Sequence, residues 1–396
     1  MVVRALVGGT MVLIGLLAGC SEEPTEINSP VADLPLAGFT TRDTTLPALR
    51  GTFFRQYSIM DGLVNLLGRN GSYTAYTAIQ FTSSAFPVRD TIAVYSATLA
   101  LHSLSWYGNP GAPFEFTVHR INRSWSSYTL TWDSVQTDFY ESLSRGTYTG
   151  NLIGDTAGIS VSLDTAMVRE WFATTTTSST TTFGIVLVPT AATQNAVRGF
   201  AVFTNADSTS YFPTLTVIAG SVTGTSRDTS VYNLGQDTFV GTDDHGTSPS
   251  TKLYVQGGVH FRSALQFDLS SIPRGAILNS AVLSLDMDNS ASHIAKFVTD
   301  TALAAHLLGD STTFTNFSSE DATTFGRRVA GSATTFSFNI RTAAQSWVRG
   351  PNYGILIRVP SAREFSTPDL YVFHDVTATT PSLRPRLRIL YSIKSN

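Results

Sequence analysis

Apolar and polar residues alternate in short runs along most of the chain, and Gly, Pro, Asn and Asp residues separate the runs. Clear examples are residues 91–95 (TIAVY), 97–101 (ATLAL), 281–285 (AVLSL) and 335–340 (TFSFNI). A period of two, in runs rich in β-branched and aromatic residues, is the pattern of a half-buried β-strand. The chain is therefore predicted to be all-β, with a jelly-roll-like β-sandwich as its architecture.

Helical signals are weak and occur in two places. Residues 165–172 and 342–348 are each long enough for one or two helical turns, and they carry Trp171 and Trp347. Each Trp precedes a strand that begins with Gly, so the two positions correspond. A large aromatic residue at a repeated position is typical of a packed core, and we expect both Trp side chains to be buried.

The chain contains nearly the same segment twice. Residues 78–101 (AIQFTSSAFPVRDTIAVYSATLAL) are followed, 186 positions later (264 − 78), by residues 264–285 (ALQFDLSSIPRGAILNSAVLSL). The residues that match at this spacing are Ala78 and Ala264, Gln80 and Gln266, Phe81 and Phe267, and Pro87 and Pro273. A repeat of this length is the size of a domain, well beyond the period of a solenoid. It predicts two tandem copies of one fold.

Landmarks and polar stretches place the expected boundaries. Residues 1–19 resemble a lipoprotein signal peptide, and residues 20–44 are polar with several Pro residues, as in a flexible tether. The first sandwich is then predicted over 45–220 and the second over 231–396. Residues 221–230 (SVTGTSRDTS) are predicted as the linker between them.

The N-terminus predicts a lipid anchor. Arg4 precedes an apolar stretch that is too short to span a bilayer, and the stretch ends in Leu17-Ala18-Gly19-Cys20, which resembles the lipobox of bacterial lipoproteins. Cys20 is the only cysteine in the chain, which excludes internal disulfides. We expect lipidation at Cys20. Ser21 follows, and not the Asp associated with inner-membrane retention, so an outer-membrane location is expected. Ser21-Glu22-Glu23 resembles the acidic signal that sends the lipoproteins of some organisms to the cell surface.

Composition removes several classes of function. Only 14% of residues are charged and the formal net charge is −3. Nucleic-acid binding needs a basic surface, so no nucleic-acid partner is expected. No sequence motif of a hydrolase or nucleotide-binding enzyme is present, and the protein is expected to be non-enzymatic. The nearest alternative, a glycosidase with paired carboxylates, would use Asp133, Asp138 and Glu141.

The second copy carries the motifs of a known family. They are Asp237-Thr238-Phe239-Val240, Arg262 to Pro273 (RSALQFDLSSIP), Ser280-Ala281-Val282-Leu283, Trp347-Val348-Arg349-Gly350, Tyr353-Gly354-Ile355 and Pro385-Arg386-Leu387. This succession resembles the DNRLRE-type domain, a β-sandwich module classed with carbohydrate-binding modules. In the first copy the residues of the family's Trp-rich element recur, but Ser127 stands where that element has Glu. The resemblance implies a sandwich fold and, for some members, binding of acidic polysaccharides.

Two groups of aromatic residues are candidate sugar platforms, because the apolar faces of sugar rings stack on exposed aromatic rings. Trp106 and Tyr107, with Asn109 as a polar partner, lie in a stretch rich in Gly and Pro that the second copy lacks. The second group is Trp125, Tyr128 and Trp132. A Trp in such a position can equally close the edge of a sandwich, so a buried Trp106 would favour a structural role.

A structural calcium ion is a further candidate. Asp237, Asp243 and Asp244 lie close together in the sequence, next to His245, and Asp286 and Asp288 form a second pair. Hard oxygen ligands on loops suit Ca²⁺, although the same residues form ordinary turns. The function expected from these observations is polysaccharide binding by a surface lipoprotein. The alternative is a structural or adhesive envelope protein without a sugar site.

Overall fold

In the computed structural model the described residues are 38–55, 62, 64–82, 91–135, 138–152, 158–172, 183–202, 211–246, 250–294, 301–309 and 324–394. Their strands form two ten-stranded sheets that fold back on themselves, and the helices are few and short. The prediction of an all-β fold of sandwich type is confirmed. Cys20, the predicted tether up to residue 37, and the Thr-rich segment 174–182 lie outside the described residues.

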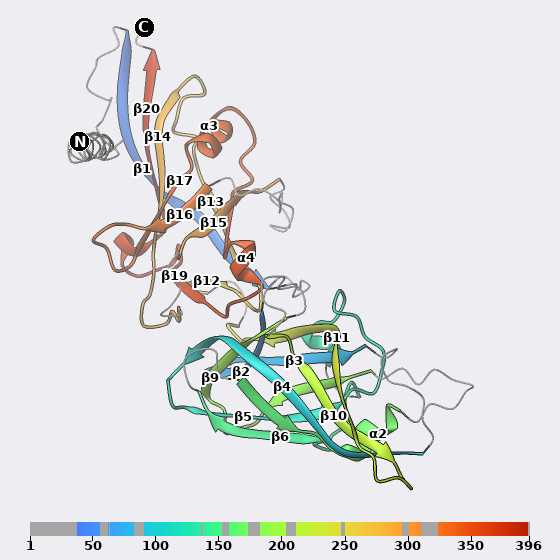
Figure 1. Ribbon diagram of the computed structural model, residues 1–396. Coiled ribbons are helices and arrows are strands. Elements are labelled where there is room, and N and C mark those ends of the chain that lie inside the picture. Colours follow the sequence, from blue (N-terminus) through green and yellow to red (C-terminus); the bar gives the residue numbers. More distant parts are fainter. Residues whose placement is uncertain are drawn as a thin grey trace, which may run out of the picture.

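Each sheet forms one module, and the two modules are separate bodies in Figure 1. Module I contains β2 (Val64–Asn70), β3 (Tyr73–Phe81), β4 (Ile92–Gly108), β5 (Pro113–Arg120), β6 (Gly146–Asn151), β7 (Gly158–Ser162), β8 (Ile185–Pro189), β9 (Asn195–Ala201), β10 (Thr214–Ser221) and β11 (Asp228–Thr242). Module II contains β1 (Phe39–Arg55), β12 (Lys252–Gln256), β13 (Phe261–Phe267), β14 (Ile277–Asp286), β15 (Leu303–Leu307), β16 (Thr324–Arg328), β17 (Thr335–Asn339), β18 (Ile355–Arg358), β19 (Leu370–His374) and β20 (Arg386–Lys394).

The strands β1 and β11 each join the two faces of a module. The first half of β1 pairs with β20 and its second half pairs with β13. The first half of β11 pairs with β10 and its second half with β3. One strand thus serves both faces, which closes the edge that an open sheet would leave unpaired.

These two strands occupy equivalent positions in opposite modules. Thr52 of β1 lies opposite Ala264, and Thr238 of β11 lies opposite Ala78. The two Thr residues are 186 positions apart (238 − 52), which is also the spacing of the two Ala residues. The pairing also shifts at the same place, between Ala48 and Arg50 in β1 and between Leu234 and Gln236 in β11.

The first strands of the two sequence repeats are therefore exchanged. The strand that opens the first copy completes module II, and the strand that opens the second copy completes module I. In Figure 1 the blue strand β1 lies among the orange and red strands of module II, whereas β11 lies with the green and cyan strands of module I. Where a linker was predicted, residues 221–230, the chain instead forms a hairpin that joins β10 to β11.

The core of each module follows from the alternating patterns of the sequence. The predicted run 91–101 lies in the long strand β4, and the runs near 281 and 335 lie in β14 and β17. From Ala97 to Ser103, buried residues of β4 alternate with less buried ones, as the period of two requires. The predicted strands are thus confirmed, and their apolar residues face the two main hydrophobic clusters.

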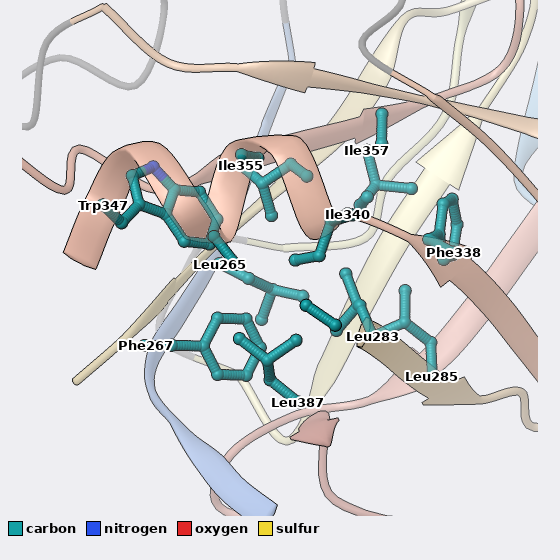
Figure 2. Close-up of a cluster of buried hydrophobic side chains, with 14 of the residues drawn as sticks. Leu265, Phe267, Leu283, Leu285, Phe338, Ile340, Trp347, Ile355, Ile357 and Leu387 are labelled. Carbon is teal, nitrogen blue, oxygen red and sulfur yellow. The ribbon is translucent and has the colours of Figure 1, made fainter. Parts of the chain in front are cut away.

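The two helical signals also correspond to helices. They are α2 (Thr165–Glu170) and α3 (Arg341–Arg349). The other short helices among the described residues are α4 (Ser361–Glu364), η3 (Trp132–Val135) and η5 (Pro381–Leu383). Trp171 follows α2 and is 6% exposed, and Trp347 of α3 is 4% exposed. Figure 2 shows the Trp347 ring beside Leu265 and Ile355 in the core of module II. The prediction that both Trp residues are core residues is confirmed.

Candidate functional site at the junction of the modules

Trp106 and Tyr107 do not form the exposed platform that the sequence predicted. Both belong to β4, which continues to Gly108 and pairs with β9. Consecutive residues of a strand face opposite sides, and here both sides are covered. Trp106 is half-buried against the core of module I, and Tyr107 is only 6% exposed in an apolar cluster shared by the modules. Asn109 is exposed, beyond the end of the strand.

The second aromatic group is mostly structural. Trp125 is half-buried and its indole Nε1 donates a 2.7 Å hydrogen bond to the carbonyl oxygen of Phe183. Trp132 packs on Tyr76, with ring centroids 4.8 Å apart. Tyr128 is 69% exposed. Two of the three rings therefore close one side of module I, and only Tyr128 presents its face to solvent.

The acidic residues proposed as calcium ligands have protein partners. Asp237 accepts a 2.6 Å hydrogen bond from the side chain of Asn65, and Asp243 accepts one of 2.7 Å from Gln256. Asp244 accepts from the amide of Gly246 as an ordinary turn residue. Among the described residues, no group of three or more His, Cys, Asp or Glu side chains is arranged to hold a metal ion.

Asp286 and Asp288, the second acidic pair, also have partners of opposite charge. Asp286 pairs with Arg386 at 2.6 Å, and Asp288 pairs with Lys252 at 2.6 Å. The hydrogen bond from Lys252 holds the pKa of Asp288 well below its usual value. These carboxylates are therefore engaged in ion pairs within module II, where Asp286 is buried and Asp288 is half-buried.

Of the acidic residues that follow Trp132, Asp133 and Asp138 are exposed and Glu141 is paired with arginines. Glu141 lies between Arg120 and Arg145, and it pairs with Arg145 at 2.8 Å. Arg145 in turn donates to Asp164, which caps α2. In this network the Glu141 carboxylate is neutralised by arginines, whereas a glycosidase would direct it toward a sugar.

Residues of both modules form one apolar cluster where the exchanged strands meet, at the junction of the modules. Phe53 of β1 and Phe239 of β11, which are equivalent residues, belong to the same cluster. Module I also supplies Leu66 and Tyr107, and module II supplies Phe261. Beside this cluster the guanidinium of Arg55, at the end of β1, donates to the carbonyl of Gly241 at 2.7 Å, at the end of β11. The ends of the two exchanged strands are thus bonded directly to each other.

A buried charged network supports the module II side of the junction. The carboxylate of Glu364, which is fully buried, accepts hydrogen bonds from Arg262 at 2.8 and 3.0 Å and from Arg358 at 3.0 Å. Removing one partner from such a buried group costs ~3–5 kcal/mol, because the remaining charge is left uncompensated. The turn of Gly257 and Gly258 is bonded to the same segment, since the Gly258 amide donates to the Glu364 carbonyl at 2.7 Å.

A cavity of about 210 Å³ opens at the junction. The turn between β2 and β3 of module I forms one wall, and β12, β19 and the segment after β11 form the others. The His245 ring stacks in parallel on the Tyr254 ring, with centroids 4.4 Å apart. The His245 Nε2 is 2.7 Å from the Gln256 side-chain oxygen, and the Gln256 amide donates to Asp243. This cavity therefore has an aromatic wall backed by a chain of polar side chains.

Tyr73 contributes the most unusual group of the cavity wall. The residue is 2% exposed, and among the described residues its hydroxyl has no hydrogen-bond partner. Burial raises the pKa of Tyr73 well above its usual value, and the nearby Asp243 adds to the effect. The hydroxyl therefore stays protonated and can donate a hydrogen bond. A buried polar group without a partner is costly. The hydroxyl lies within the wall, close to Gly241 and Gly258, so a ligand in the cavity would have to shift neighbouring atoms to reach it.

The junction was not found from the sequence. Arg262 entered only as part of the family motif and His245 only as a neighbour of the acidic cluster, and Glu364, Tyr254 and Tyr73 carried no motif. The one available signal was that Thr52-Phe53 recurs as Thr238-Phe239 at the same spacing as the rest of the repeat, which marks the two exchanged strands as equivalent. No helix in the described part of the chain is long and apolar enough to cross a membrane. No protein-family model and no curated protein matches the chain, so the resemblance to DNRLRE-type domains stays a prediction.

Proposed function

We propose that the protein is a non-enzymatic lipoprotein of the outer membrane or cell surface with a structural or adhesive role. The observation that carries this proposal is the reciprocal exchange of β1 and β11. The aromatic residues expected to bind sugar are largely packed against the cores or the junction, which supports the same conclusion. The anchor at Cys20 remains part of the proposal.

The exchange gives the chain a property that tandem modules on a flexible linker lack. Two connections cross the junction, one from β1 to β2 and one from β11 to β12. If one connection breaks, the exchanged strand still holds the modules together through its pairing. Such a junction fixes the position of each module relative to the other. A protein that resists tension or holds two partners apart needs this property.

Cutting the connection between β11 and β12 tests this property. A protease site inserted there gives two polypeptides after cleavage, one of which still contributes β1 to module II. The nicked protein is expected to elute as one particle under native conditions and as two pieces in denaturant. Separation of the pieces under native conditions would contradict the interlocked junction and the role proposed for it.

A second candidate function, binding of a saccharide, is favoured by the junction cavity. Its volume is below the ~300–1,000 Å³ of pockets for drug-sized ligands, so it suits a single ring at the end of a glycan. The wall that includes Tyr254 and His245 supplies an aromatic surface, and Tyr73, Gln256 and Asn70 supply polar groups. This site replaces Trp106 and Tyr107 as the place where a polysaccharide would bind.

The variant Tyr73→Phe tests this second candidate because it removes only the hydroxyl. Loss of one hydrogen bond is expected to weaken binding by about 0.5–1.5 kcal/mol, or roughly two- to tenfold in Kd. The melting temperature should not fall, since the hydroxyl has no protein partner. Binding is measured on a panel of glycans with the mature chain, and Tyr128→Phe serves as the exposed control. A panel that yields no binding leaves only the structural role.

A further inference from the structure

The grooves that receive β1 and β11 are equivalent, and so are the two strands. Each strand enters its groove with the same register and the same shift in pairing. The first copy's strand is accepted by the second copy's groove, and the reverse also holds. Each groove therefore accepts, in the same register, a strand that belongs to the other sequence copy.

The contacts of β1 with module II are specific to this strand. Asp43 accepts from the Arg388 guanidinium through both carboxylate oxygens, at 2.6 to 3.2 Å. A Cβ atom on Gly51 would come within 2.3 Å of the Asp375 carboxylate, so a larger residue there would have to displace that side chain. Leu46 and Ala48 pack against the core of module II, and Phe53 packs on Tyr254 with centroids 4.8 Å apart.

None of these contacts depends on β1 belonging to the same chain as module II. Besides the connection to β2, the strand contacts module I at its end, through the Arg55 hydrogen bond to Gly241 and the packing of Phe53 in the shared cluster. An identical strand from a second molecule would make every one of the same contacts.

We propose that β1 is a donor strand and that a second copy of this chain is its partner, each molecule completing module II of the other. The interface is the groove between β13 and β20, and closure by a two-fold axis gives a dimer with no unfilled groove. Within one chain the local concentration of β1 is fixed by the connection to β2, whereas exchange between chains rises with protein concentration. Assembly therefore depends on the concentration at which the protein folds.

The experiment uses two full-length mature variants that begin after Cys20 and so contain no other cysteine. One carries Thr41→Cys in β1 and the other carries Ser392→Cys in β20, at positions whose hydroxyl oxygens lie 3.2 Å apart. The two are unfolded, mixed, refolded at increasing concentration and oxidised. A control mixture pairs Thr41→Cys with Tyr128→Cys, an exposed residue of module I.

A disulfide-linked heterodimer of the first pair is expected to increase with concentration and to exceed the control at every concentration. Light scattering on the wild-type chain should show dimer in the same range. A heterodimer no more abundant than the control, with wild-type protein monomeric at all concentrations, would overturn the proposal. In a monomer β1 can still complete module II of its own chain. That result would therefore leave the proposed structural role of the single chain unchanged.

Discussion

A fragment of residues 64–242 should fold as one cooperative unit, and the shorter fragment 64–220 should not. The longer fragment contains every strand of module I, including β11. The shorter fragment lacks β11 and with it the buried side chains of Tyr232, Leu234, Phe239 and Val240. Each large apolar side chain contributes roughly 1.5–3 kcal/mol when buried, so their combined loss is comparable with the ~5–15 kcal/mol stability of a whole domain.

Thermal unfolding followed by circular dichroism checks this prediction. The fragment 64–242 is expected to give a single sharp transition, and 64–220 a broad one or none. Added peptide 228–242 should restore a transition to the shorter fragment, whereas a peptide with the same composition in scrambled order should not. Equal melting of the two fragments would mean that β11 does not complete module I.

The strands of this protein could be predicted because their local patterns are strong. The run TIAVY and the run ATLAL alternate with period two, and they lie in β4 as expected. Trp171 and Trp347 could be assigned to the cores because they recur at matching places in the two copies. These inferences depend on residues that are close in sequence, where propensity and pattern act directly.

The exchange could not be predicted from the same patterns. The pair Thr52-Phe53 of β1 recurs as Thr238-Phe239 in β11, and each strand has the same register in its groove. A sequence repeat shows that the strands are equivalent, but equivalence leaves open which groove each one enters. That choice depends on the short connections at the junction and on packing between modules, neither of which has a local signature.

The candidate site was missed for a related reason. Trp106 and Tyr107 precede a Gly/Pro turn, which favours an exposed loop in sequence reasoning. In the structure the strand continues through both residues, and the second module covers Tyr107. Tyr73 follows a two-residue turn and has no motif, so only the fold shows that the residue lines a cavity. Burial between modules is a property of the assembled fold and not of a local segment.

The central claim is that β1 pairs with β20 of module II and not with β10 of module I. Two cysteine pairs distinguish these arrangements in the mature chain, which has no other cysteine. Thr45 lies opposite Arg388 in the exchanged arrangement. Without exchange, Thr45 would take the place of Val231 and lie opposite Thr216. Directly opposed residues of antiparallel strands are close enough for a disulfide.

The measurement is disulfide formation in the monomer fraction, mapped by mass spectrometry of peptides under non-reducing conditions. The double variant Thr45→Cys/Arg388→Cys is expected to form its disulfide almost completely, and Thr45→Cys/Thr216→Cys is expected to remain reduced. A disulfide between residues 45 and 216, with residues 45 and 388 left as thiols, would place β1 in its own module and contradict the exchange.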